Sequence, residues 1–297
     1  MKTERLKWAA LALALTAAPA MAQLRVAATV PNMGMIVREI GGDAVSVRVM
    51  APPDRDAHYL EARPSMMAAL RRADLVVAVG AELEIGWLPA AIRGANNRRV
   101  QPGQRGHFEA ANHVRLIGGG RPADRALGDV HPMGSPHVYL DPERMAVIGH
   151  ALAERLAQLQ PDEAEMFRRN AAAFEARVEE HMARWRSQVE NAPGVLLYHE
   201  DADYLLAALG VEHLGYLEPL PGIPPTAAHL RALVRDLSGK NGIVWSMNYH
   251  PAQGGEFIAR ELGWRAVQQP SQVAMDGDAD AYFAMIDAWV QTLVSDD

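Results

Sequence analysis

Three histidines stand where side chains could bind a metal ion. His58 follows a β-rich run and a proline-containing loop, His137 lies in a Gly- and Pro-rich segment before a helical stretch, and His199 ends a β-rich run. In open α/β sheets, ligands bind beyond the carboxyl ends of strands, where loops converge. Imidazole nitrogen is a good ligand for Zn²⁺ and other late divalent ions, so three histidines with one oxygen would make a four-coordinate site.

The intervals between these histidines match no local metal-binding motif, so two other functions of the protein stay open. A zinc hydrolase would use three histidines and a bound water, with Glu200 beside His199 as its general base. Neighbouring residues at a strand end point in opposite directions, and no second catalytic constellation appears, so we expect no enzyme activity. The other reading is an exported adhesin or scaffold that holds a merely structural metal.

The composition limits the partners and the kind of metal site. The 297 residues include 29 Lys and Arg against 36 Asp and Glu, a net charge of −7, so we expect no nucleic-acid partner. The sequence has no cysteine, which excludes disulfides and thiolate metal sites. Any metal must therefore be held by histidine and carboxylate side chains.

The N-terminus has the three parts of a signal peptide in order. A positively charged start precedes an apolar run at 8–18, which is too short to span a bilayer well, and the small-x-small sequence AMA at 20–22. We therefore expect residues 1–22 to be removed on export to the periplasm. No cysteine follows the apolar run, so we expect no lipid anchor.

Beyond residue 22, short apolar runs alternate with amphipathic segments, which predicts parallel βαβ units. In the first half, strands are expected at 24–30, 45–50 and 74–79, and helices at 33–40, 64–72 and 85–92. In the second half, strands are expected at 194–198, 213–217, 242–245 and 265–267, and helices at 202–209, 226–237, 255–262 and 279–293.

The middle of the chain predicts a helical connection between two α/β lobes. Residues 141–191 hold no convincing strand, whereas strong helix formers fill 162–190 without a glycine, so this long helix should be rigid. We expect an N-terminal lobe at 23–140, a helical linker at 141–191 and a C-terminal lobe at 192–297. The Gly- and Arg-rich segment 101–128 is expected to be a loop.

Five stretches of this sequence resemble the zinc and manganese receptors, the metal-binding family of ABC-transporter solute-binding proteins. They are DAHYLEARPS at 56–65, ADLVVAVG at 73–80 with LEIGWL at 83–88, GSPHVYLDP at 134–142, YHEDADYL at 198–205 and LEPLPGIPP at 217–225. The resemblance spans nearly the whole mature chain. It implies an α/β fold of two lobes joined by a long rigid helix, with a metal cleft between the lobes.

The resemblance also implies a function and a ligand set. His58, His137 and His199 stand where the family's first three metal ligands stand. The implied function is capture of a divalent ion in the periplasm and delivery to an ABC-transporter membrane permease. The resemblance also implies a monomer, to which a periplasmic metallochaperone could deliver the ion. Zn²⁺ is favoured over Mn²⁺, because manganese receptors more often need carboxylate oxygens.

The fourth ligand is where this sequence departs from the family. Many members carry an aspartate after the last short strand, where this chain reads AVQQPS at 266–271. The candidates left open are Glu218, His250, Asp276, Asp278 and water. His131 could support a ligand or be a plain loop residue. The long His-rich loop of some zinc receptors is also missing, because residues 101–130 contain only His107 and His113.

Overall fold

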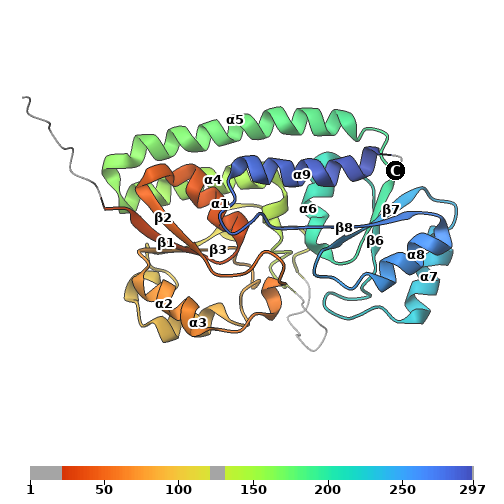
Figure 1. The fold of residues 1–297 in the computed structure, drawn as a ribbon, viewed down its shortest axis with the longest axis horizontal. Coiled ribbons are helices and arrows are strands. Elements are labelled where there is room, and N and C mark those ends of the chain that lie inside the picture. Colours follow the sequence, from red (N-terminus) through yellow and green to blue (C-terminus); the bar gives the residue numbers. More distant parts are fainter. Residues whose placement is uncertain (1–21, 121–130, 296–297) are drawn as a thin grey trace, which may run out of the picture.

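The computed structural model describes residues 22–120 and 131–295, which form two α/β lobes beneath a layer of long helices (Figure 1). In this part of the chain each lobe holds a four-stranded parallel sheet, with the order β2-β1-β3-β4 in the first lobe and β6-β5-β7-β8 in the second. The two-lobed α/β fold expected from the sequence is confirmed. No helix among the described residues has both the length and the apolar character of a membrane span.

The first lobe follows the alternation that the sequence predicts. Its strands are β1 (Leu24–Ala28), β2 (Val45–Val49), β3 (Leu75–Ala78) and β4 (His107–Glu109), and its helices are α1 (Pro31–Gly41), α2 (Pro64–Arg72) and α3 (Leu88–Ala95). All four residues of β3 are buried, as expected of a central strand that is covered on both faces.

The second lobe repeats this architecture. Its strands are β5 (Gly194–Leu197), β6 (His213–Tyr216), β7 (Gly242–Met247) and β8 (Arg265–Gln269). Its helices are α6 (Asp203–Leu209), α7 (Ala227–Leu237) and α8 (Gln253–Leu262), and the chain ends with α9 (Ala279–Val294).

Two expectations about local structure are wrong. The segment 101–128 is not a loop throughout, because β4 pairs in parallel with β3, with His107 opposite Val76. A three-residue edge strand among polar residues leaves almost no periodic signal. Residues 121–128 of that segment lie outside the described residues. The helix expected at 85–92 begins three residues later, because a turn with positive φ at Ala81 and Glu82 precedes it.

Two long antiparallel helices connect the lobes. They are α4 (Pro142–Leu159) and α5 (Ala164–Gln188), and α5 runs without interruption for 25 residues, or about 37 Å. Phe167, Phe174 and Trp185 are fully buried on one stripe of α5, so the helix packs against the core along its length. A continuous helix fixed in this way is a stiff connector.

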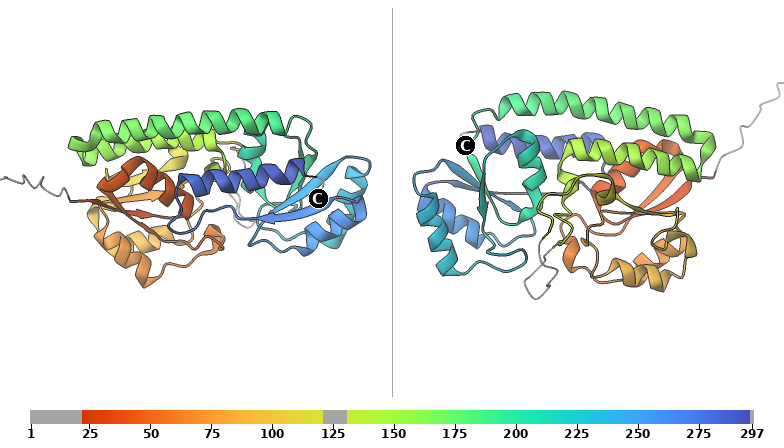
Figure 2. Two further views of the ribbon diagram at one scale, coloured as in Figure 1. Left: turned by 45° about the horizontal axis from the view of Figure 1, so that its top comes forward. Right: turned by 180° about the vertical axis from the view of Figure 1, so that it is seen from behind.

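A second crossing returns from the C-terminal lobe to the first. After β8 the chain leads into α9, which packs against α5 and α1 (Figures 1 and 2). One hydrophobic core accordingly contains residues of both sheets as well as Trp289 of α9. The expected boundaries between the N-terminal lobe, the helical linker and the C-terminal lobe, at residues 140 and 191, stay predictions.

The fully buried Asn32 of α1 fastens this crossing to the first lobe. Its side-chain nitrogen donates to the Ser271 carbonyl at 2.9 Å, and its side-chain oxygen accepts from the Val273 N–H at 3.0 Å. The Asn32 N–H, at the N-terminus of α1, donates to the Gln272 side-chain oxygen at 2.9 Å. Three hydrogen bonds therefore join segments that lie far apart in the sequence.

We expect Asn32→Ala to lower the free energy of unfolding by about 2–4 kcal/mol, because it leaves two buried backbone groups of the crossing without partners. Urea denaturation of the metal-free protein measures this. Asn170→Ala is the matched control, since the partly buried Asn170 makes one hydrogen bond, to the Ile40 carbonyl at 3.0 Å. Equal losses in the two variants would contradict a special role of the Asn32 contacts.

Candidate metal centre

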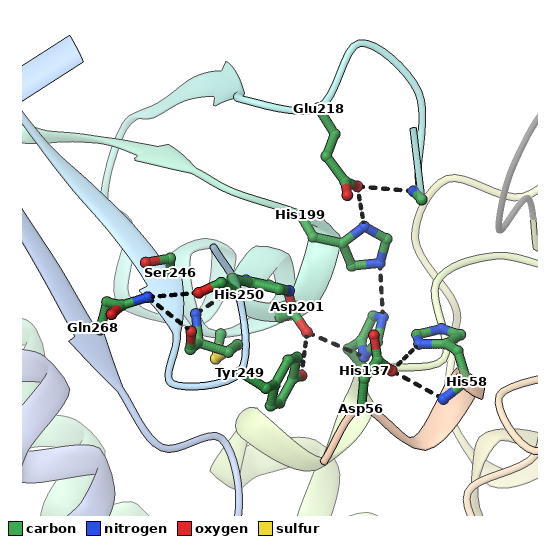
Figure 3. Close-up of polar contacts among 12 residues, drawn as sticks. Asp56, His58, His137, His199, Asp201, Glu218, Ser246, Tyr249, His250 and Gln268 are labelled. Carbon is green, nitrogen blue, oxygen red and sulfur yellow. Dashed lines mark hydrogen bonds and ion pairs between the residues drawn. The ribbon is translucent and has the colours of Figure 1, made fainter. Parts of the chain in front are cut away.

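The three histidines that the sequence singles out meet between the lobes, two of them in or beside short 3-10 turns and one just beyond the end of a strand. His58 lies in the 3-10 turn Ala57–Tyr59, where the buried Trp87 side chain donates to the Ala57 carbonyl at 2.9 Å. His137 precedes the turn Val138–Leu140, which leads into α4. His199 follows β5 after one residue (Figure 3). The first two belong to the N-terminal lobe and the third to the C-terminal lobe.

Their rings are close enough to share one ion. His137 Nε2 lies 3.3 Å from His199 Nε2, and the His58 ring centroid lies 5.2 Å from that of His137 and 5.7 Å from that of His199. A tetrahedral Zn²⁺ with Zn–N bonds of 2.0–2.1 Å needs ligand nitrogens about 3.3–3.4 Å apart. The observed nitrogen separation therefore fits a zinc ion without large rearrangement.

A fourth imidazole completes the cluster. His131 is buried, and its Nε2 lies 3.1 Å from His58 Nε2. Nitrogens of His58, His131 and His137 all lie within 4.8 Å of one another. The sequence alone indicates only a supporting or a plain loop residue at this position, because its one signal is its place six residues before His137 in a Gly- and Pro-rich segment. Its position makes it the best-placed fourth ligand.

The other candidates for a fourth ligand face elsewhere. Glu218 Oε2 contacts His199 Nδ1, on the far side of that ring from the cluster. Asp278 accepts from the Ala281 N–H and so caps α9. Asp276 interacts with Arg38 at the crossing. The ring of His250 stacks on Tyr198 and lies 6.3 Å from the ring of His199.

Oxygen atoms accept hydrogen bonds from the Nδ1 atoms of three of the rings, on the side that faces away from the cluster. His58 Nδ1–H donates to Asp56 at 2.6 Å, His199 Nδ1–H to Glu218 at 2.8 Å, and His137 Nδ1–H to the Tyr139 hydroxyl oxygen at 3.0 Å. A metal-binding histidine commonly donates its second ring nitrogen to a carboxylate or another oxygen, which fixes the tautomer and orients the ring. These contacts leave each Nε2 directed into the cluster.

The electrostatics of the cluster differ between its members. Burial and the neighbouring imidazoles lower the pKa of His137 well below the usual range. Burial also acts to lower the pKa of His199, but Asp201 and Glu218 outweigh it and raise that pKa to about 10. Burial acts to raise the pKa of Asp56, whereas its hydrogen bonds from His58 lower it to about 2. A protonated His199 can therefore donate from Nε2 to a neutral His137.

A cavity of about 250 Å³ opens beside the cluster and has walls from both lobes. Asp56, His58 and Tyr59 line it on one side, and residues of the second lobe, including His199 and His250, line it on the other. The imidazole cluster is thus buried yet adjacent to an opening between the lobes, as a site that must bind and release an ion requires.

Known proteins resemble this chain along most of its length. The high-affinity zinc uptake system protein ZnuA of Paracoccus denitrificans is 27% identical over an alignment of 262 residues that covers 79% of each chain. A crystal structure of ZnuA has a TM-score of 0.73 at 22% identity and covers 92% of this chain and 98% of its own, which shows a common fold. FpvC of Pseudomonas aeruginosa, solved with Ni²⁺, has a TM-score of 0.74 at 25% identity, with 92% and 96% covered.

The family assignment rests on a match along the whole described chain. Residues 26–296 match the model of the family described as ZnuA, zinc-uptake complex component A, periplasmic. The match includes both lobes, the linking helices and all four histidines of the cluster. The chain therefore belongs to the ZnuA family, whose members are metal-binding substrate-binding proteins of ABC transporters and not enzymes.

Proposed function

We propose that the protein captures one Zn²⁺ ion between its lobes and delivers it to the membrane permease of an ABC transporter. The observation that supports this most strongly is the cluster of four imidazoles between the lobes. Nitrogens of His58, His131 and His137 of one lobe lie within 4.8 Å of one another, and His199 Nε2 of the other lobe lies 3.3 Å from His137 Nε2. Each would bind the ion through Nε2. Because both lobes supply ligands, the ion would be released when their relative position or the local loops change.

The donor set is the reason for proposing zinc. Four neutral imidazole nitrogens suit zinc and other late divalent ions, whereas manganese prefers carboxylate, carbonyl and water oxygens. The carboxylates of Asp56 and Glu218 contact the ring nitrogens that face away from the cluster, so they serve as charge partners behind the ligands. FpvC, a protein of the same fold, has been solved with Ni²⁺ and with Mn²⁺, so the fold alone does not select the ion.

The proposal places the mature protein in the periplasm, as a monomer without a lipid anchor, where a metallochaperone could load it. The signal peptide at 1–22 lies almost wholly outside the described residues. We expect the intact mass of the protein from a periplasmic extract to correspond to a chain that starts at Gln23. A mass that includes residues 1–22, or an added lipid, would contradict this placement.

Loss of any one imidazole should weaken zinc binding by about a hundredfold or more, since loss of a merely supporting residue already costs 10–100-fold. We expect this for His58→Ala, His131→Ala, His137→Ala and His199→Ala in a competition titration with a chromophoric chelator. His150→Ala is the control, because His150 is exposed and pairs with Glu175 at 2.8 Å on the helical layer. If His131→Ala alone keeps the zinc affinity of the parent, the site has three histidine ligands and His131 is not one of them.

Zinc binding should release at least one proton per ion near neutral pH. The pKa of about 10 keeps the metal-free His199 protonated, and the zinc ion must replace the proton on Nε2. Affinity should therefore rise as pH rises toward 10 and fall on acidification. Calorimetry in buffers of different ionisation enthalpy measures the number released. Glu218→Gln should reduce it, because it removes one of the carboxylates that raise the pKa. No release in the parent would contradict the assignment.

A further inference from the structure

A buried carboxylate of the C-terminal lobe faces a histidine of the N-terminal lobe. Asp201 lies in the 3-10 turn Glu200–Ala202 and is only 2% exposed. Its Oδ1 lies 3.9 Å from His137 Nδ1, across the junction between the lobes (Figure 3). The Tyr249 hydroxyl donates to the same oxygen at 2.9 Å, which fixes the orientation of the carboxylate.

The second oxygen of Asp201 is poorly satisfied. Within the described part of the chain, Oδ2 has no hydrogen-bond donor, and His250 Nε2 lies 3.6 Å from it. The Met247 N–H donates to His250 Nδ1 at 3.1 Å, so the proton of that ring is on Nε2 and faces Asp201 without reaching it. Burying a carboxylate with so few donors is unfavourable unless positive charge is nearby.

We propose that Asp201 is a positioning residue for metal binding, which balances the charge of the bound ion by attracting the ligand His137 from the opposite lobe. This inference rests on the proposed function, because it takes His137 as a ligand through Nε2. Asp56 and Glu218 contact ligands of their own lobes, whereas Asp201, which also acts on His199 of its own lobe, faces a ligand of the opposite lobe.

The chemistry of a metal-bound imidazole gives this contact its effect. A divalent ion on Nε2 withdraws electrons from the ring and makes Nδ1–H a stronger donor, which favours a carboxylate acceptor. In the structure, Nδ1 lies 3.0 Å from the neutral Tyr139 hydroxyl of its own lobe and 3.9 Å from Asp201 of the other. Metal loading should therefore strengthen the attraction to Asp201 and draw the lobes together at this point.

Asp203 offers a matched control. It lies two residues further along, at the start of α6, and it also accepts a hydrogen bond from a tyrosine, Tyr216, at 2.7 Å. The two aspartates thus share residue type, neighbourhood and hydrogen-bond chemistry. They differ in that Asp201 forms an interaction with the ligand His137.

The test compares zinc affinity and metal-free melting temperature in Asp201→Asn and Asp203→Asn. Asparagine can still accept from Tyr249, so we expect Asp201→Asn to weaken zinc binding about tenfold or more while the metal-free melting temperature stays the same or rises. Asp203→Asn should bind zinc within about twofold of the parent. Tyr249→Phe, which keeps the charge but frees its orientation, should cost about threefold.

Two results would overturn the role of Asp201. One is zinc affinity in Asp201→Asn within about twofold of the parent. The other is an affinity loss that comes with a fall in the metal-free melting temperature, since this indicates a structural role. Both leave the proposed function intact if the parent binds zinc and the histidine variants do not. A parent protein that fails to bind zinc overturns the proposed function and this inference together.

Discussion

A divalent cation buried among neutral imidazoles needs negative charge within a few ångströms, and the arrangement between the lobes follows from this need. Asp56 and Glu218 contact the outward nitrogens of His58 and His199, and Asp201 faces His137. Asp56 and Glu218, together with the Tyr139 hydroxyl behind His137, orient three of the rings so that each Nε2 is directed into the cluster. Charge balance and ligand geometry therefore come from one set of contacts.

A site with ligands from both lobes requires lobes that hold a defined relative position. The α4–α5 layer connects the lobes, and the crossing held by Asn32, which leads into α9 beside α5, adds a second connection. Two connections resist a wide hinge motion better than one. We therefore expect change on metal release to lie mainly in the loops and turns that carry the histidines, with only a small movement of the lobes.

Much of the fold could be predicted from the sequence, because its signals are local. The apolar run of β3 and the uninterrupted helix formers of α5 are clear in the sequence. His58, His137 and His199 could be predicted as ligands because each follows or precedes an expected strand or helix. The short edge strand β4 could not be found, since its three residues are held by pairing with β3. The position of His131 beside His58 could not be predicted for a similar reason. It depends on the path of a Gly- and Pro-rich loop, which no periodic pattern specifies.

The supporting carboxylates illustrate the same limit. Asp56 is two residues from His58 and could be guessed, whereas Glu218 meets His199 from the next strand of the sheet, and Asp201 meets His137 only because the lobes are apposed. The aspartate that many family members carry after β8 is missing, and we propose that His131 completes the site instead. Here the structure offers a histidine where the pattern has a carboxylate.

X-ray absorption at the zinc edge of the loaded, untagged protein tests the central claim most directly. Four imidazoles predict four nitrogen scatterers at about 2.0–2.1 Å with the outer-shell pattern of histidine rings. The same measurement on His131→Ala should show one imidazole fewer. An oxygen-rich shell of five or six ligands, or an unchanged spectrum in His131→Ala, would contradict the four-histidine site.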